Sequence, residues 1–313
     1  MKRLRIVILG GTGFVGSHMV PRLCADGHTV KVLSRNREQH RDLAVLPLAS
    51  VVSADVYDLD ALREQLAGAD AAINLVGILN EHGNNGRGFQ KAHVELTEIL
   101  IAACQSARVP RLLQMSALRA GEGESHYLKT RGEAESRVKS SSLAWTIFRS
   151  SVIFGPGDGL FFRFASLLRM TPVLPLARAH AKFEPVYVGD VAEAFARAIV
   201  HPHTAGHTYE LFGPRVIELG ELVRWTADII GKRRWIIPLP DALGYLQAAV
   251  GEWLPGKPIS RDNFRSLKLD SVGAEDGLAA LGIVSTPMDV VMPPLLRGDD
   301  RQRRFDRFRE ERS

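Results

Sequence analysis

The first half of the chain alternates short apolar runs with stretches of helical periodicity. Residues 6–9 read IVIL, a continuous apolar run typical of strands that are buried on both faces. Five further runs of similar length follow, spaced so that a helix fits between most of them. The predicted strands cover residues 5–9, 29–33, 51–54, 71–75, 111–115 and 144–149.

Helical patterns fill the intervals between these runs. Residues 14–23 can form a helix directly after the first strand, and residues 89–106 carry apolar side chains on one helical face. Strands that alternate with helices predict a parallel sheet with helices on both faces. Right-handed crossovers then give a doubly wound α/β fold.

The pattern becomes irregular after the sequence FGPG at residues 154–157. Short strands are predicted at 183–188 and 208–211, and helices at 191–200, 218–230 and 241–250, with prolines between them. We expect a smaller α/β lobe that packs over the carboxyl ends of the main strands, where open α/β sheets bind ligands. The predicted organisation is a doubly wound domain at 1–155, a substrate or partner lobe interleaved with it at 156–296, and a charged tail at 297–313.

Composition narrows the class of protein. The 313 residues are 45% hydrophobic and 24% charged, which argues against a disordered chain. The spacing of Cys24 and Cys104 fits neither a metal site nor a disulfide framework. We therefore expect no metal site, and we expect the protein to be in a reducing compartment. The net charge is +5, but the arginines are scattered along the chain and no nucleic-acid-binding motif is present. Nucleic-acid binding is therefore not expected. The apolar run after Met1 is too short for a signal peptide, and no run is long enough to span a membrane.

The tail at 297–313 is dense in arginine and in acidic residues. A solvated or frayed terminus is the interpretation we favour, and a segment that docks a partner is the alternative.

The break between the first strand and the first helix is rich in glycine. Gly10, Gly13 and Gly16 have the spacing G-x-x-G-x-x-G, and Thr12, Phe14 and Val15 lie between them. Backbone N–H groups at a helix N-terminus attract phosphate, and the missing side chains let a pyrophosphate approach. Because a strand precedes this turn and a helix follows, it predicts a dinucleotide site.

The end of the second strand indicates which dinucleotide binds. NAD-preferring sites place a carboxylate there, but this chain reads Ser34-Arg35-Asn36. The planar guanidinium of Arg35 suits a 2′-phosphate, so NADP(H) is expected over NAD(H), with NAD(H) as the alternative. Asp55 and Val56 follow the third strand. The Asp55 carboxylate could accept a hydrogen bond from the adenine, or it could cap a local turn.

The fourth strand is followed by Leu75, Val76 and Gly77. We expect the glycine to let the cofactor pass close to the backbone.

With these residues the chain resembles the short-chain dehydrogenase/reductase superfamily, in its extended and atypical branch. The motifs are GGTGFVG at 10–16, Asp55-Val56, NLVG at 74–77, Met115-Ser116-Ala117, and Tyr127 at the start of a helix. The stretches RSSVIFGPGDGLFFRF, which contains Ser151 and Val152, and KFEPVYVGDVA are similar to the group of the thirty-nine-kilodalton accessory subunit of respiratory complex I.

The resemblance implies a Rossmann fold and a bound NADPH, with Ser151 and Val152 added to the residues that contact it. It further implies an oxidoreductase or epimerase acting on a small carbonyl or alcohol, with a link to quinone metabolism. A non-catalytic NADP(H)-binding accessory or assembly protein of a respiratory complex is the alternative. The expected location is cytoplasmic, with peripheral association with the inner membrane as a further option.

The resemblance also implies a catalytic unit of Ser, Tyr and Lys, in which Tyr and Lys are spaced Y-x-x-x-K. Here Tyr127 is followed at the fourth position by Arg131, while Lys129 lies on another face. Arg131 can supply a cation beside the phenol and bond the ribose, although it is not equivalent to Lys. Ser116 is the candidate hydroxyl donor, and a capping or cofactor-facing serine is the alternative.

Other residues allow two interpretations. His126 adjoins Tyr127 and could exchange protons, but a solvated histidine is favoured. His93 fits a satisfied core histidine, and Asp190 fits a helix N-cap. Residues 80–88, NEHGNNGRG, fit either a mobile lid or a plain flexible loop. Residues 235–254 fit core packing or a substrate wall better than a membrane-surface helix, which would need a basic polar face.

Overall fold

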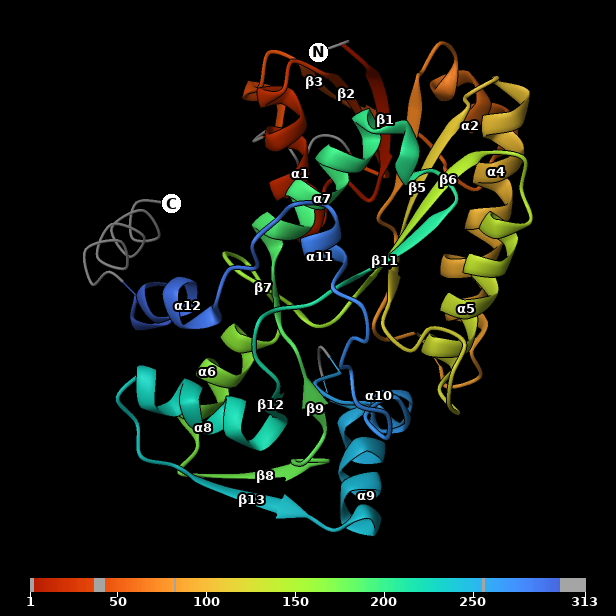
Figure 1. Ribbon diagram of the computed structural model, residues 1–313. Helices are drawn as coiled ribbons and strands as arrows, with labels where there is room; N and C mark the ends of the chain where they lie inside the picture. The colour runs from red at the N-terminus through yellow and green to blue at the C-terminus, as the bar shows by residue number, and fades with distance from the viewer. Residues whose placement is uncertain (1–2, 37–42, 82, 255–256, 299–313) are drawn as a thin grey trace, which may run out of the picture.

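The chain folds around a parallel sheet of seven strands. The computed structural model describes residues 3–36, 43–81, 83–254 and 257–298 (Figure 1). The strand order is β11-β6-β5-β4-β1-β2-β3, and every neighbouring pair is parallel. The bounds are β1 Arg5–Leu9, β2 Thr29–Ser34, β3 Ala49–Ser53, β4 Ala71–Asn74, β5 Arg111–Ala117, β6 Ala144–Ser150 and β11 His207–Leu211.

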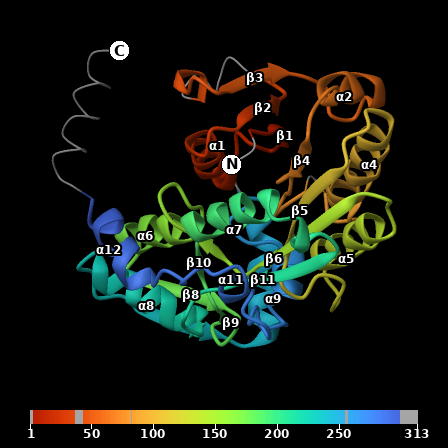
Figure 2. The same cartoon turned by 45° about the horizontal axis from the view of Figure 1, so that its top comes forward.

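Helices cover both faces of this sheet, which confirms the predicted doubly wound fold (Figures 1 and 2). One face packs on α1 (Phe14–Ala25) and α7 (Val188–Val200), and the other on α2 (Leu59–Leu66), α4 (Leu96–Ser106) and α5 (His126–Lys139). Side chains of β1 alternate between the two cores, with Ile6 and Ile8 in one and Val7 and Leu9 in the other. The apolar run of β1 is continuous because both of its faces are buried.

The predicted strands match the observed ones to within two residues at each end. The segment at 208–211 was expected as a short strand of the second lobe. It is instead part of β11, which pairs with β6 along its whole length and forms one edge of the main sheet. Helix α7 likewise packs against α1. The chain therefore returns to the first lobe after entering the second.

The helix expected at 89–106 starts slightly earlier and changes its winding. A single turn, α3 (Arg87–Phe89), is followed by a π-helical segment, η3 (Gln90–Glu95), and then by α4. π-Helical turns are rare and occur frequently at functional sites. Here the π-helical segment carries the buried His93.

The described residues of the second lobe form three small apolar cores, and the lobe lies beneath the carboxyl ends of the main strands in Figure 1. It contains three two-stranded sheets and several helices. Its strands are β7 Ile153–Phe154, β8 Val173–Ala177, β9 Lys182–Phe183, β10 Val186–Tyr187, β12 Ile217–Glu218 and β13 Trp235–Leu239. Its helices are α6 Phe161–Met170, α8 Leu219–Ile229, α9 Asp241–Gly251, α10 Arg261–Ser266 and α12 Met288–Arg297, while α11 Gly277–Ala280 packs beside β11.

The prediction of a single strand at 183–188 is wrong. Residues 182–187 form β9 and β10, which pair with β12 and β7 in different sheets. Pro185 separates them and has no backbone N–H to donate to a ladder. Asp190 also differs from its expected role, because the N-cap of α7 is Tyr187. The Asp190 carboxylate lies in the first turn and accepts bonds from the backbone N–H and the hydroxyl of Thr286.

Residues 235–254 were expected to form core packing or a substrate wall, but much of their large apolar surface is exposed. Ile236 and Ala248 pack against cores of the second lobe, and Glu252 lines a pocket. The side chains of Trp235 and Trp253 are 76% and 89% exposed. Leu243, Leu246 and Val250 on α9 are also more than half exposed. Only Gly244, Ala248 and Gly251 of α9 are buried, because they contact Phe264, Ala177 and Ile259.

Within the described ranges, no helix has both the length and the apolar character to cross a membrane. The same residues include no group of three or more His, Cys, Asp or Glu side chains arranged to hold a metal ion. The tail beyond residue 298 lies outside the described residues.

Candidate functional site

The glycine turn after β1 lies against the end of β4. Gly10 has a φ of +76°, a left-handed conformation that favours glycine. A Cβ atom there would sit 3.0 Å from the carbonyl carbon of Leu75 and from the nitrogen of Val76. The turn therefore occupies the point where the strand order reverses between β1 and β4, the usual position for ligands in open α/β sheets.

The first turn of α1 is open to an anion. Gly13 is the N-cap, and no side chain caps the helix. A Cβ atom on Gly16 would lie 2.3 Å from the carbonyl oxygen of Gly11, so glycine is required where the helix crosses the turn. The backbone N–H groups of Phe14 and Val15 belong to this first turn, where α-helical partners are lacking. The helix dipole adds a positive potential, so the cradle fits a phosphate group.

A cation stands at the end of the neighbouring strand. Arg35 follows β2 directly and is exposed, while Ser34 is buried and its hydroxyl accepts a bond from the N–H of Asn36. Burial raises the pKa of Tyr57, and the charge of Arg35 partly offsets this effect. Arg35 therefore acts on the same edge of the sheet as the glycine turn.

Asp55 and Val56 form the turn after β3. The Asp55 carboxylate accepts a bond of 2.9 Å from the backbone N–H of Tyr57, so the residue caps a local turn. Asp55 was expected either to bond the adenine or to cap a local turn, and this hydrogen bond to Tyr57 supports the turn cap. Val56 packs against the core between the sheet and α2.

Arg131 is buried at the carboxyl ends of β4 and β5. Its Nη1 donates to the carbonyl oxygens of Met115 at 3.0 Å and Val76 at 3.4 Å. A Cβ atom on Gly77 would lie 1.9 Å from Nη2, so the guanidinium fills the space that a side chain at this position would take. The open space expected for a cofactor beside Gly77 is thus occupied by Arg131. Its Nε has no hydrogen-bond partner among the described residues.

Tyr127 lies beside Arg131, as the spacing in the sequence predicted. The guanidinium carbon is 5.6 Å from the centroid of the Tyr127 ring. Phe89 and His93 pack edge-on against the same ring at 6.1 and 5.6 Å. Lys129 is exposed and belongs to another face of α5. The phenol of Tyr127 therefore lies beside both the guanidinium of Arg131 and the rings of Phe89 and His93.

Ser116 faces α5 and makes a different contact from the one expected of a proton donor. Its hydroxyl donates to the buried carboxylate of Glu135 at 2.7 Å. Arg149 donates to the same carboxylate from both Nε and Nη2, at 2.9 and 2.7 Å. These bonds raise the pKa of Arg149. The structure therefore places Ser116 in an ion-paired network that no sequence spacing indicates.

His93 is a satisfied core histidine, as predicted. Its Nε2 accepts a bond from the N–H of Ile78, and its Nδ1 lies 2.9 Å from the hydroxyl of Thr130. Burial and the charge of Arg131 lower the pKa of His93 to about 2, so the ring is neutral. It therefore fixes the chain after β4 and does not act as an acid. His126 is half-buried, and its ring lies against Gly86.

Ser151 and Val152 connect the main sheet to the second lobe. The Ser151 hydroxyl donates to the carbonyl oxygen of Ser271 at 2.9 Å and accepts from the N–H of Glu184 at 3.3 Å. Val152 packs into a core of the second lobe. Both residues therefore join the main sheet to the second lobe through contacts within the protein.

The segment after β4 is held by a buried carboxylate. Glu81 accepts bonds of 2.7 Å from the backbone N–H groups of Gly86 and Gly88, and its own carbonyl oxygen accepts from Lys257. Described residues of this segment are thus bonded to one another and to the second lobe, a role of Glu81 that the sequence did not indicate.

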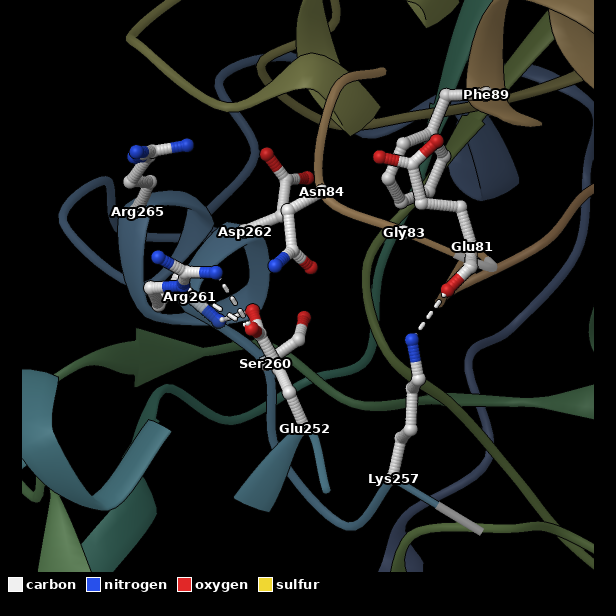
Figure 3. Close-up of a pocket in the computed structure, with 10 residues that line it drawn as sticks. All are labelled: Glu81, Gly83, Asn84, Phe89, Glu252, Lys257, Ser260, Arg261, Asp262 and Arg265. Carbon is white, nitrogen blue, oxygen red and sulfur yellow. Dashed lines mark hydrogen bonds and ion pairs between the residues drawn. The ribbon is translucent and has the colours of Figure 1, made fainter. Parts of the chain in front are cut away.

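A pocket lies between this segment and α10 (Figure 3). It encloses about 390 Å³, part of which is open to solvent. Arg261 and Glu252 pair across one wall at 2.9 Å, and Lys257 reaches Glu81 across the other. Burial alone would raise the pKa of Glu252, but the bonds from Arg261 lower it overall. Phe89 forms part of the lining and also packs on Tyr127, so the pocket adjoins the phenol.

Asp262 is the most important residue that the sequence analysis missed. Its carboxylate extends from α10 and accepts bonds from the backbone N–H groups of His126 at 2.7 Å and Tyr127 at 3.0 Å. Ser125 accepts from Leu128 as the N-cap of the same helix. The second lobe therefore holds the first turn of α5. The contact joins residues more than 130 positions apart, which no local pattern could reveal.

Replacing Asp262 with Ala should loosen the start of α5. The variant leaves two helix N–H groups without their acceptor, so we expect a loss of about 1–3 kcal/mol of unfolding free energy. Hydrogen exchange at the amides of His126 and Tyr127 should speed up, as measured by mass spectrometry. Asp58→Ala removes the N-cap of α2 and is the matched control, because it should affect exchange only in α2. Unchanged exchange in α5 would contradict the role of Asp262.

His93 should make the stability of the protein depend on pH. Its pKa is about 2 in the folded state and near 6.5 in the unfolded chain, so only the unfolded state takes up a proton as pH falls below 6.5. The stability contributed by neutral His93 is complete above pH 6.5 and declines below it, by up to about 1.4 kcal/mol per pH unit.

Urea unfolding of the wild type and of His93→Gln between pH 7.5 and 5 measures this effect. The difference in unfolding free energy between the two proteins should shrink as pH falls. His203→Gln, at an exposed histidine, should leave the difference from the wild type nearly constant. If the difference in unfolding free energy between the wild type and His93→Gln does not change with pH, the ring of His93 is not a neutral buried group in the folded protein.

Comparisons with known proteins agree with this geometry. A family model described as NAD(P)H-binding matches residues 10–157. Of the solved structures that match, a dTDP-glucose 4,6-dehydratase from Streptomyces venezuelae, determined with NAD bound, has a TM-score of 0.75 and 20% sequence identity. The match covers 94% of this chain and 96% of that one. At this identity the likeness establishes the shared fold.

Curated relatives include subunits of NADH dehydrogenase and a reductase. An Arabidopsis thaliana protein, NADH dehydrogenase [ubiquinone] 1 alpha subcomplex subunit 9, is 30% identical over 85% of this chain and 68% of its own length. The NADH-ubiquinone oxidoreductase 40 kDa subunit of Neurospora crassa is 27% identical over 75% of this chain, which spans only 63% of that protein. A ceramide reductase from Caulobacter vibrioides is 28% identical over 75% of this chain and 74% of its own length.

The glycine turn, the open helix start and the Tyr127–Arg131 pair occur in a fold shared with NAD-bound enzymes. The match to the Arabidopsis protein extends through both lobes. The chain therefore belongs to the NAD(P)-binding short-chain dehydrogenase/reductases, in the atypical branch that contains the alpha subcomplex subunit 9 of mitochondrial NADH dehydrogenase.

Proposed function

We propose that the protein binds NADP(H) and interconverts a carbonyl and an alcohol, with Tyr127 as the proton-transferring residue. The observation that carries this proposal is the placement of Tyr127 and Arg131, 5.6 Å apart, at the same end of the sheet as the uncapped start of α1. One region thereby offers an anion cradle and a phenol beside a fixed cation. Bound NADP(H) would supply or accept the hydride.

Residues of this chain would hold the cofactor at several points. The pyrophosphate fits the first turn of α1, where glycines leave the backbone accessible. Arg35 is exposed at the end of β2 and suits the 2′-phosphate of NADP(H). Arg131 has one buried nitrogen without a described partner and lies at the ends of β4 and β5, which supports a role toward the ribose.

Tyr127 would donate a proton to the substrate oxygen or remove one from it. A positive charge beside a phenol would stabilise the negative charge that develops on its oxygen when the proton leaves. Arg131 provides such a charge in a site where carbonyl oxygens and aromatic rings surround it. The neighbouring His93 is neutral and bonded on both ring nitrogens, so it leaves proton transfer to Tyr127.

The pocket beside Phe89 is the proposed substrate site. It adjoins Tyr127 through the Phe89 ring and through Asp262, and its walls carry both charged and apolar groups. The relative named ceramide reductase supports a carbonyl on an apolar molecule as the substrate class, and quinone-like carbonyls belong to the same class.

A second candidate function is cofactor binding without turnover. Two observations support it. The Ser116 hydroxyl donates its proton to the Glu135 carboxylate and so does not point it toward a substrate. Arg131 also stands at the position where the superfamily has lysine. In that case NADP(H) would stabilise the fold, and the second lobe would bind a respiratory complex, as the names of two relatives suggest. Peripheral association with the inner membrane is part of this proposal.

Cofactor preference is tested by thermal denaturation with NADPH and with NADH. NADPH at one hundred times its Kd should add about 2.7 kcal/mol to the unfolding free energy. Arg35→Ala should weaken NADPH binding by about tenfold or more, because charge-assisted bonds to the 2′-phosphate are lost, and should leave NADH binding unchanged. Arg63→Ala, on the exposed surface of α2, is the control. Equal effects of Arg35→Ala on both cofactors would reject the assignment.

Turnover is tested by following NADPH absorbance with a panel of ketones and quinones. Tyr127→Phe should lower kcat by about 100-fold or more, since general acid catalysis is lost, while the Kd for NADPH changes little. Tyr209→Phe, on β11 against Phe148, should retain full activity. Tight NADPH binding by the wild type without oxidation of the cofactor by any substrate would favour the non-catalytic function.

A further inference from the structure

Arg265 lines the pocket from α10, the short helix that also carries Asp262 (Figure 3). It lies four residues after Arg261 and three after Asp262, so the three side chains leave α10 within an arc of about 100°. Arg265 is half-buried, and its guanidinium makes no hydrogen bond or ion pair with another residue that the structure describes. Its five N–H donors are therefore available to a ligand in the pocket.

The other two cations of the pocket are held by bonds within the protein. Arg261 pairs with the carboxylate of Glu252 at 2.9 Å. The Nζ atom of Lys257 donates to the carbonyl oxygen of Glu81 at 2.7 Å, and this bond fixes its position without neutralising its charge. Of the three cations, Arg265 is the one whose side chain no described residue bonds.

Each carboxylate in the lining accepts bonds from N–H groups of the protein. Glu81 and Asp262 each accept from two backbone N–H groups, at 2.7 to 3.0 Å. Glu252 accepts from the backbone N–H and from the side chain of Arg261. The three carboxylates thus have structural partners, and they keep their negative charges in the walls. These walls would repel a ligand with a single negative charge less than a ligand with two.

Arg265 also lies close to the start of α5. Glu124 directly precedes Ser125, the N-cap of this helix. A bond of 2.9 Å from Lys268 lowers the pKa of Glu124, and the charge of Arg265 contributes to the same shift. The charge of Arg265 therefore acts both in the pocket and beside the first turn of the helix that carries Tyr127.

We propose that the substrate carries a carboxylate in addition to its carbonyl group, and that Arg265 binds this carboxylate. The planar guanidinium presents parallel N–H donors that match the two oxygens of a carboxylate. The rest of the molecule would extend past Phe89, whose ring packs on Tyr127 at 6.1 Å. The acidic walls favour a single negative charge over a phosphate group, which carries close to two at neutral pH. The substrate class is therefore a keto acid or the corresponding hydroxy acid.

This inference rests on the proposed function, because it takes the pocket beside Phe89 as the substrate site. It narrows the proposed substrate class, since a quinone or a simple ketone would leave Arg265 without a partner. The carboxylate would not change during the reaction and would only hold the carbonyl group in position. Arg265 is accordingly a residue for substrate binding and specificity, and Tyr127 remains the residue proposed for proton transfer.

The test measures the binding of a small keto acid and of its neutral ester by ligand-observed NMR. The probes are 4-oxopentanoate and methyl 4-oxopentanoate, added to the full chain in the presence of saturating NADP⁺. The proposed phosphate cradle of α1 is then filled, and no carbonyl can be reduced. The acid should bind at least tenfold more tightly than the ester, because the acid alone can form an ion pair with Arg265. Equal binding of the two probes would overturn the proposal.

Variants of Arg265 locate the carboxylate. Arg265→Gln should bring the affinities for the acid and the ester within twofold of each other, and Arg265→Lys, which keeps the charge, should retain part of the preference. Lys268→Gln is the matched control, because Lys268 follows α10 and pairs with Glu124 outside the lining of the pocket. An undiminished preference in Arg265→Gln, or an equal loss in Lys268→Gln, would reject the assignment to Arg265.

Two further measurements separate the explanations. Hydroxyacetone phosphate, titrated under the same conditions, tests the class of anion. Tighter binding of this phosphate than of 4-oxopentanoate would overturn the carboxylate assignment. The thermal shift of each variant with NADPH shows that the variant is folded, and it reports on the cofactor site independently of the keto acid.

Turnover distinguishes this inference from the proposed function. If the wild type reduces 4-oxopentanoate, Arg265→Gln should raise KM at least tenfold and should act less on kcat, whereas Tyr127→Phe should act mainly on kcat. If the wild type reduces no substrate but prefers the acid through Arg265, the proposed turnover is rejected while the carboxylate site is supported.

Discussion

The start of α5 depends on a carboxylate from the other lobe. Every helix begins with N–H groups that lack partners within the helix. In α5, Ser125 provides one acceptor, and Asp262 provides the acceptors for His126 and Tyr127. Because Asp262 belongs to α10, the helix that carries Tyr127 and Arg131 is fixed only when the second lobe is folded against the first. The matched NAD(P)H-binding segment ends at residue 157, well before this contact. The segment that defines the family therefore does not contain the whole site.

The buried arginine determines the electrostatics around Tyr127. The Nη1 atom of Arg131 donates to the carbonyl oxygens of Met115 in β5 and of Val76 just after β4, and the planar guanidinium leaves Nη2 beside Gly77, whereas an ammonium group is a compact point charge. This arrangement requires glycine at position 77, since a Cβ atom there would overlap the guanidinium. The same charge helps to keep His93 neutral. One substitution relative to the superfamily pattern thus affects the neighbouring backbone and the histidine together, and it places a guanidinium beside the Tyr127 ring.

The parts of the fold that follow from local pattern could be predicted from the sequence. Strands β1, β2, β4, β5 and β6 are largely buried, and the glycine turn has a distinctive spacing, so the sequence predicts both. Strand β11 was misplaced because HTYEL is half-buried at the edge of the sheet and lacks a continuous apolar run. Asp262, and Glu135 with its partner Arg149, escaped prediction because their roles arise from contacts between distant segments. The exposure of Trp235 and Leu246, which lie in a segment predicted to form core packing or a substrate wall, escaped prediction because the sequence does not distinguish an exposed apolar residue from a buried one.

The contact between α9 and α10 links one wall of the pocket to the start of α5. The second lobe must bury enough apolar surface to support Asp262, and Phe264 on the same short helix contributes by packing against Gly244 of α9. Because α9 uses only small residues for this contact, its larger apolar side chains are left on the outside. Glu252 and Lys257, which follow α9, line the pocket beside Phe89. The same packing that supports the carboxylate of Asp262 therefore also positions one wall of the pocket.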